Sequence, residues 1–255
     1  MKIHNKFFYN SCGKIIERIL QPLYMKKILT ALILLLITSL SAQACPSCNP
    51  EIRKAIFDST FYPNLLTMLL AFLVLAFVVV ILSVLSAKRY RANVSKYPTR
   101  QILTPVPLTT TSIIIGIGIG GFIDGIVLHQ LLQWHEMLSN KIPPTDYVSK
   151  SVNMFWDGIF HAFTLIVTFV GIILLWKLTG RRDINRSRNL FAGGLWLGWG
   201  LFNIIEGVVD HHLLKLHNVK EISMNKEVWN YGFLGISVLM ILLGWYLLNK
   251  KSEHH

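Results

Sequence analysis

Residues 120–135 read GGFIDGIVLHQLLQWH, and residues 202–217 read FNIIEGVVDHHLLKLH. From residues 124 and 206 onward, both stretches follow the pattern Asp/Glu-Gly-Ile/Val-Val-x-His-x-Leu-Leu-x-x-His without a gap. The segments that come next align more loosely, with Trp156-Asp157-x-x-Phe160 on Trp229-Asn230-x-x-Phe233. The sequence therefore predicts two copies of a two-helix hairpin. An even number of membrane spans per copy makes such a repeat parallel.

The composition is that of a membrane protein with several spans. Hydrophobic residues make up 53% of the chain and charged residues 15%, well under the roughly 25% of a soluble domain. Five segments are apolar and long enough to cross a bilayer as helices. They lie at about Leu65–Leu85, Ile113–Trp134, Met154–Trp176, Leu190–Leu214 and Val228–Leu248. We expect an all-α membrane protein with five transmembrane helices after an N-terminal signal or anchor, surrounded by the lipid bilayer. Gly116 and Gly118 align with Gly198 and Gly200, which predicts close helix packing.

The distribution of the basic residues behind the net charge of +12 indicates the membrane topology. Of the 25 basic residues, 18 lie in four places: before residue 28, at 88–100, at 177–188 and after residue 249. Alternate connections carry few, which is the positive-inside pattern. A nucleic-acid partner needs no such alternation and is not expected. The pattern predicts a bacterial inner-membrane protein whose mature N-terminus is periplasmic and whose C-terminus, with the tail 249–255, is cytoplasmic.

The N-terminal region resembles an export signal. Residues 25–44 combine lysines, a short apolar run and Ala42-Gln43-Ala44, typical of a cleaved signal peptide or of an uncleaved signal anchor. Residues 1–24 are either a cytoplasmic tail or lie upstream of a true start at Met25. A periplasmic segment, 45–61, then carries Cys45 and Cys48, which form a structural disulfide, a redox pair or a thiolate metal site. Residues 62–112 add one extra transmembrane helix and a basic cytoplasmic loop before the four-helix unit 113–248.

Histidines and carboxylates gather in the repeat region, and the predicted topology places most of them in the outer half of the bilayer. Ionisable groups inside a membrane are costly and usually functional or paired. The predicted metal ligands are His129, His161, His211 and His212. The carboxylates predicted to support them, or to carry protons, are Asp124, Asp157, Glu206 and Asp210. His135 and His217 are interpreted as interfacial residues.

Helical phase argues against one compact site. At 100° per residue, His129 points about 140° away from Asp124, and His211 equally far from Glu206. We therefore expect the carboxylates to face one helix contact and these histidines another, where His161 completes a centre with His129 and His211. Asp157 lies one turn from His161 and is placed to orient its ring.

Three functions are compatible with this cluster. It is a metal or haem site, a buried polar network that holds the hairpins in register, or a proton or ion pathway in a small transporter. The sequence contains no Ser-His-Asp arrangement, no phosphate-binding loop and no H-E-x-x-H motif, so an enzyme is not favoured.

The runs GGFIDGIVLHQLLQWHEML, WDGIFHAFTL and GWGLFNIIEGVVDHHLLKLH resemble an uncharacterised family of bacterial multi-pass membrane proteins, domain of unknown function 2243. The resemblance covers about residues 113–248 and implies a four-helix membrane unit without an established activity. It also implies an association with respiratory oxidase assembly factors, which favours copper or haem as cofactor and a role in oxidase biogenesis or copper homeostasis. Asn230 stands where the resemblance leads us to expect an acidic residue.

Overall fold

A computed structural model describes residue 30, residues 49–96 and residues 103–250 of the chain. Apart from residue 30, the predicted signal at 25–44 lies outside the described residues, as do Cys45, Cys48 and nearly all of the C-terminal tail. The chain divides into two compact units, Met1–Arg53 and Lys54–His255, with the short helix α3 (Pro50–Ile56) across the boundary. The other helices found among the described residues lie in the second unit.

The second unit consists of helices, and no strand occurs among its described residues. Their bounds are α4 Phe61–Lys96, α5 Val106–Ile123, α6 Tyr147–Leu178, α7 Arg188–Glu206 and α8 Lys226–Asn249. Two π-helical segments, η2 (Asp124–Leu131) and η3 (Gly207–Leu213), continue α5 and α7 directly. Counting these continuations, five helices of the described part are long and apolar enough to cross a membrane. The prediction of an all-α protein with five spans is confirmed.

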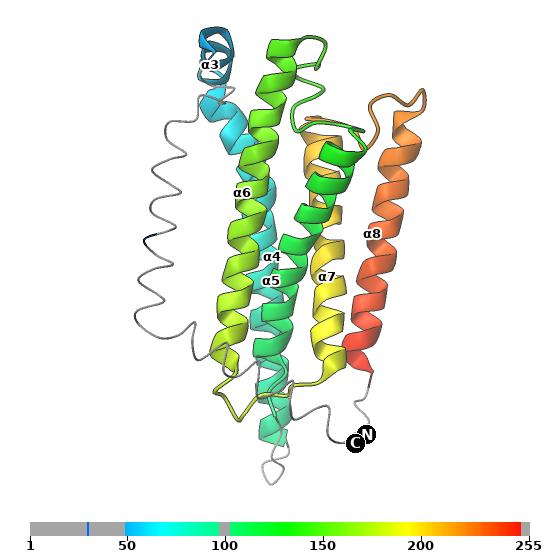
Figure 1. The fold of residues 1–255 in the computed structure, drawn as a ribbon. Coiled ribbons are helices and arrows are strands. Elements are labelled where there is room, and N and C mark those ends of the chain that lie inside the picture. The colour runs from blue at the N-terminus through cyan, green and yellow to red at the C-terminus, as the bar shows by residue number, and fades with distance from the viewer. Residues whose placement is uncertain (1–29, 31–48, 97–102, 251–255) are drawn as a thin grey trace, which may run out of the picture. The chain divides into compact units, whose positions relative to one another are not determined.

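The two helices that carry the repeated motif form the centre of the unit. In α5 with η2, and in α7 with η3, 61% of the most apolar stretch is buried, against 11–22% in the other three helices. Helices α4, α6 and α8 instead expose large apolar side chains such as Phe77, Ile173 and Leu239, as lipid-facing helices do. Figure 1 shows α5, α6, α7 and α8 of this unit running alongside one another.

Glycines permit the central helices to touch through their backbones. A Cβ atom on Gly116 would collide with the carbonyl oxygen of Leu195, and one on Gly198 with the carbonyl oxygen of Ile113. Residues 113 and 195 are themselves equivalent in the two motif copies, so the same contact is made in both directions. Without a hydrophobic driving force in lipid, such close approach is what allows van der Waals packing to hold helices together.

This contact yields a stability prediction. Gly198→Ala places a methyl group against the Ile113 carbonyl, and we expect it to lower the free energy of unfolding by about 1–3 kcal/mol through overpacking. Unfolding of the purified protein in detergent, followed by circular dichroism, measures the change. Gly158→Ala on α6 is the matched control, because its Cβ would meet no atom within 4 Å. Equal destabilisation by both variants would contradict the close-packing account.

Candidate metal centre

The π-helical turns overturn the expected helical phase. A π-helix closes its turns with i→i+5 hydrogen bonds, which brings residues five apart onto nearly the same face. Asp124 and His129 are such a pair, with Oδ2 and Nε2 3.1 Å apart. Glu206 and His211 are the equivalent pair, with Oε1 and Nε2 3.0 Å apart. The expectation that these histidines face away from the carboxylates is wrong, because it assumed α-helical winding throughout.

A left-handed residue ends the winding of each segment. Gln133 has φ of 48° and Lys215 has φ of 49°, in the region that non-glycine residues rarely adopt. Directly after them, Trp134 N–H donates to the Leu128 carbonyl (2.9 Å) and Leu216 N–H to the Asp210 carbonyl (2.8 Å). The chain thereby turns back on itself, so that the next residues, His135 and His217, point inward.

His135 and His217 lie stacked in the middle of the cluster. Their ring centroids are 4.5 Å apart and their planes differ by 3°. His135 Nδ1 donates to the Val219 carbonyl (2.8 Å), and His217 Nδ1 donates to the Met137 carbonyl (3.0 Å). Each ring is thus anchored two residues beyond the other histidine. The sequence interpretation placed both residues at the membrane interface, whereas the structure buries them at 2% and 0% exposure.

The surroundings of these two rings differ electrostatically. Burial lowers the pKa of His135 well below its usual range, and the neighbouring imidazoles, His129 first, lower it further. Burial also acts to lower the pKa of His217, but the hydrogen-bonded Glu206 carboxylate outweighs it, and the pKa is raised. Because the Nδ1–H group of His135 donates a hydrogen bond to the Val219 carbonyl, the neutral ring has a free lone pair on Nε2.

The two copies differ in how the outer helices support the cluster. Asp157 on α6 accepts hydrogen bonds from His129 Nδ1 (2.9 Å) and from Met137 N–H (2.8 Å). Asn230 on α8 accepts the equivalent bond from Val219 N–H at 3.0 Å. No hydrogen bond from His211 Nδ1 to a described residue accompanies it. Asn230, which stands where an acidic residue is expected, therefore keeps the contact to the backbone but supplies no carboxylate.

Two groups of buried donors are close enough to hold a metal ion. One consists of Asp124, His129 and His135, and the other of His135, Glu206, His211 and His217. Within each group, one ligand atom per residue lies within 4.8 Å of all the others. Several of these atoms have no hydrogen-bond partner among the described residues: both Asp124 oxygens, Nε2 of His129 and His135, Glu206 Oε2 and both His211 nitrogens. The carboxylate contacts of His129 and His211 are short but lack hydrogen-bond alignment.

The remaining predicted residues lie outside these groups. His161 Nδ1 donates to the Asp157 carbonyl (2.6 Å), and its ring lies near Phe122. His212 Nδ1 donates to the Gly207 carbonyl (2.8 Å), and its ring lies beside Tyr231. Asp210 is buried and close to the cluster without joining either group. The expected triad of His129, His161 and His211 is therefore not brought together.

Comparison with known proteins identifies the family. The model of DUF2243, described as a predicted membrane protein, matches residues 111–251, which contain both donor groups. No curated protein and no solved structure matches the chain. Since the family model covers more than half of the 255 residues, the chain belongs to the DUF2243 family of predicted membrane proteins.

Proposed function

We propose that this membrane protein binds divalent transition-metal ions in a buried centre to which each motif copy contributes one carboxylate and two imidazoles. The first set is Asp124, His129 and His135, and the second is Glu206, His211 and His217. The observation that carries the proposal is the group of buried nitrogen and oxygen atoms without hydrogen-bond partners. Buried polar atoms of this kind are costly unless a partner or an ion satisfies them.

The anchoring of the rings favours a metal over a purely structural network. A metal-bound histidine usually donates its other ring N–H to a carboxylate or a backbone carbonyl, which fixes its tautomer. His129, His135 and His217 all do so through Nδ1. His129 and His135 then present Nε2 to the interior of the cluster without a hydrogen-bond partner among the described residues, whereas His217 Nε2 bonds to Glu206 Oε1 (3.2 Å). A structural network would instead pair the inward nitrogens with aligned acceptors, and His129 and His135 lack them.

The donor atoms restrict the choice of metal. Imidazole nitrogen and carboxylate oxygen suit zinc, iron and Cu(II), whereas Cu(I) prefers sulfur ligands. Two histidines and one carboxylate also leave coordination positions open. The close spacing of the rings disfavours haem. Consecutive ring centroids are 4.3 to 4.7 Å apart along the series His129, His135, His217 and His211. This spacing leaves no space for a porphyrin between the rings. A role in respiratory oxidase biogenesis or copper homeostasis remains a prediction from the family resemblance.

The proposal predicts a metal content that depends on His211. We expect the full chain, purified from cells supplied with zinc, iron and copper, to hold about two ions, one per donor set. His211→Ala should remove about half of the bound metal, because the second donor set loses one of its two imidazole ligands. Elemental mass spectrometry of the purified protein gives the stoichiometry. His212→Ala is the matched control, since this neighbour lies outside both groups and should retain the metal. A metal-free wild-type protein, or equal losses in the two variants, would count against the proposal.

A second prediction concerns the carboxylate behind His129. Asp157→Asn keeps the side-chain shape but removes the charge that orients the His129 ring. We expect the affinity of the first donor set to fall by about 10- to 100-fold, the usual effect of losing such a supporting carboxylate. Competition with a chelator of known affinity measures it. Asp183→Asn, an exposed carboxylate paired with Arg181, is the control and should change nothing. An unchanged affinity in Asp157→Asn would contradict the supporting role of Asp157 behind His129.

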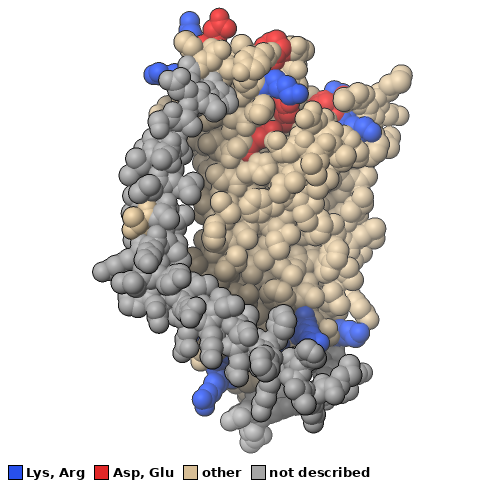
Figure 2. All heavy atoms as spheres, in the orientation of Figure 1, with Lys and Arg blue, Asp and Glu red and all other residues tan. Residues whose placement is uncertain are grey.

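We also propose the orientation that the basic residues indicate, with the site in the outer half of a bacterial inner membrane. On the face shown in Figure 2, acidic side chains lie among basic ones at one end, and the charged side chains seen at the other end are basic. Reporter fusions at Asn93 and Asn185 should read cytoplasmic, and one at Thr145 should read periplasmic, because basic loops are retained inside. The reverse readings would place the donor sets at the cytoplasmic side.

A further inference from the structure

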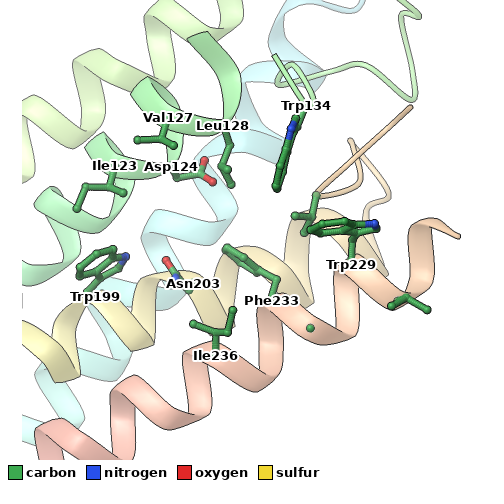
Figure 3. A pocket seen from close by; sticks show the side chains of 13 residues that line it. Ile123, Asp124, Val127, Leu128, Trp134, Trp199, Asn203, Trp229, Phe233 and Ile236 are labelled. Atoms are coloured by element: carbon green, nitrogen blue, oxygen red, sulfur yellow. The ribbon is translucent and has the colours of Figure 1, made fainter. Parts of the chain in front are cut away.

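A second site adjoins the donor sets from the side of α8. It is a cavity of about 500 Å³ between η2, α7 and α8, within the range of small-molecule sites. Figure 3 shows Trp199 toward one end, Trp134 and Trp229 toward the other, and Phe233 beside the opening between them. Above the two tryptophans at 134 and 229, the Lys220 ammonium lies 4.7 and 4.5 Å from their ring centroids. Aromatic side chains therefore make up much of the wall.

Two buried acceptors interrupt this apolar lining. Asp124 and Asn203 are 4% and 5% exposed, and both point into the cavity (Figure 3). Asp124 Oδ1 and Asn203 Oδ1 have no hydrogen-bond partner among the described residues. The amide nitrogen of Asn203 has only a weak contact, 3.8 Å long, to the sulfur of Met240. Since unsatisfied buried acceptors are costly, the cavity fits a molecule that brings hydrogen-bond donors.

The equivalent face of the first motif copy shows what fills such a space. The cavity wall on α8 contains Trp229 and Phe233, which align with Trp156 and Phe160 on α6. There, helix α4 supplies phenyl rings: Phe61 lies 5.4 Å from Trp156, and Phe72 lies 5.9 Å from Phe160, between ring centroids. Nothing in the described part of the chain covers the α8 face in the same way. In the first copy, aromatic rings of α4 thus occupy the position that corresponds to the cavity of the second copy.

From these observations we propose that the cavity binds a lipid-soluble phenol or hydroquinone. Its ring packs between the tryptophans and Phe233, and its O–H groups donate to Asp124 and Asn203. Entry is from the bilayer, because Val228 and Ile236 of the cavity wall are 63% and 56% exposed on an outer helix. Asp124 belongs also to the first donor set, yet one carboxylate oxygen can accept a hydrogen bond while the other faces His129.

Equilibrium binding of radiolabelled decylhydroquinone to the full chain in lipid nanodiscs, under argon, tests the site. Saturable binding above that of empty nanodiscs is expected. Gly232→Phe should weaken it at least about tenfold, because Gly232 lines the cavity and has open space at its Cβ position. Gly235→Phe, on the same helix with equally open space but outside the lining, should bind as the wild type does. Equal binding by the two variants would overturn the proposal.

The donor requirement is tested with the ligand itself. The dimethyl ether of decylhydroquinone keeps the ring and the chain but has no O–H, and we expect it to bind at least about tenfold more weakly. Asn203→Leu should weaken the hydroquinone and leave the ether unchanged. Equal affinity of both ligands for the wild type would mean that the cavity takes any apolar molecule, such as an acyl chain, and would refute the proposal. Metal content, measured on the same samples, separates this result from a failure of the metal centre, because Gly232 and Asn203 lie outside both donor sets.

Discussion

The arrangement of the site depends on the π-helical winding at the ends of the two central helices. Within a bilayer every backbone N–H and C=O must be bonded internally, so a helix there cannot unwind freely to aim a side chain. An i→i+5 turn keeps the backbone bonded while it changes the angle between residues. Asp124 and His129 meet for this reason, as do Glu206 and His211. The left-handed residues Gln133 and Lys215 then return the chain toward the centre.

The connections that follow the motif complete the centre from above. Asn140 N–H donates to the Leu216 carbonyl (2.9 Å), and Glu221 N–H donates to the Trp134 carbonyl (2.8 Å). Each loop is thus bonded to the residue that precedes the buried histidine of the other loop. These bonds join the two loops next to the stacked rings of His135 and His217, which also bond to the Val219 and Met137 carbonyls. The glycine contacts between α5 and α7 fix the spacing at the opposite side of the cluster, so the donors are held by packing as well as by hydrogen bonds.

The sequence was sufficient for the spans and for the regions that carry the site, but not for its geometry. Apolar length predicted the five helices, and the matched glycines predicted close helix packing without indicating which helices meet. The grouping of ligands failed, because the 3.6-residue period used to assign faces does not describe η2 and η3. His135 and His217 were assigned to the interface because they follow the apolar run. Their place as the last residue of both motif copies, at the same spacing from the carboxylate, was the signal that favoured a ligand role.

The two motif copies have the same donor residues, but the residues around these donors differ between the α6 side and the α8 side. On the α6 side, Asp157 supports His129 with a charge, and α4 covers the surface with Phe61 and Phe72. On the α8 side, Asn230 is neutral and the surface opens into the cavity. A supporting carboxylate raises the basicity of a ligating imidazole, so in the proposed metal centre His129 is the stronger donor of the equivalent pair His129 and His211. Asp124, the carboxylate of the first proposed donor set, also lines the cavity, so the proposed metal centre and the proposed ligand site meet at this residue.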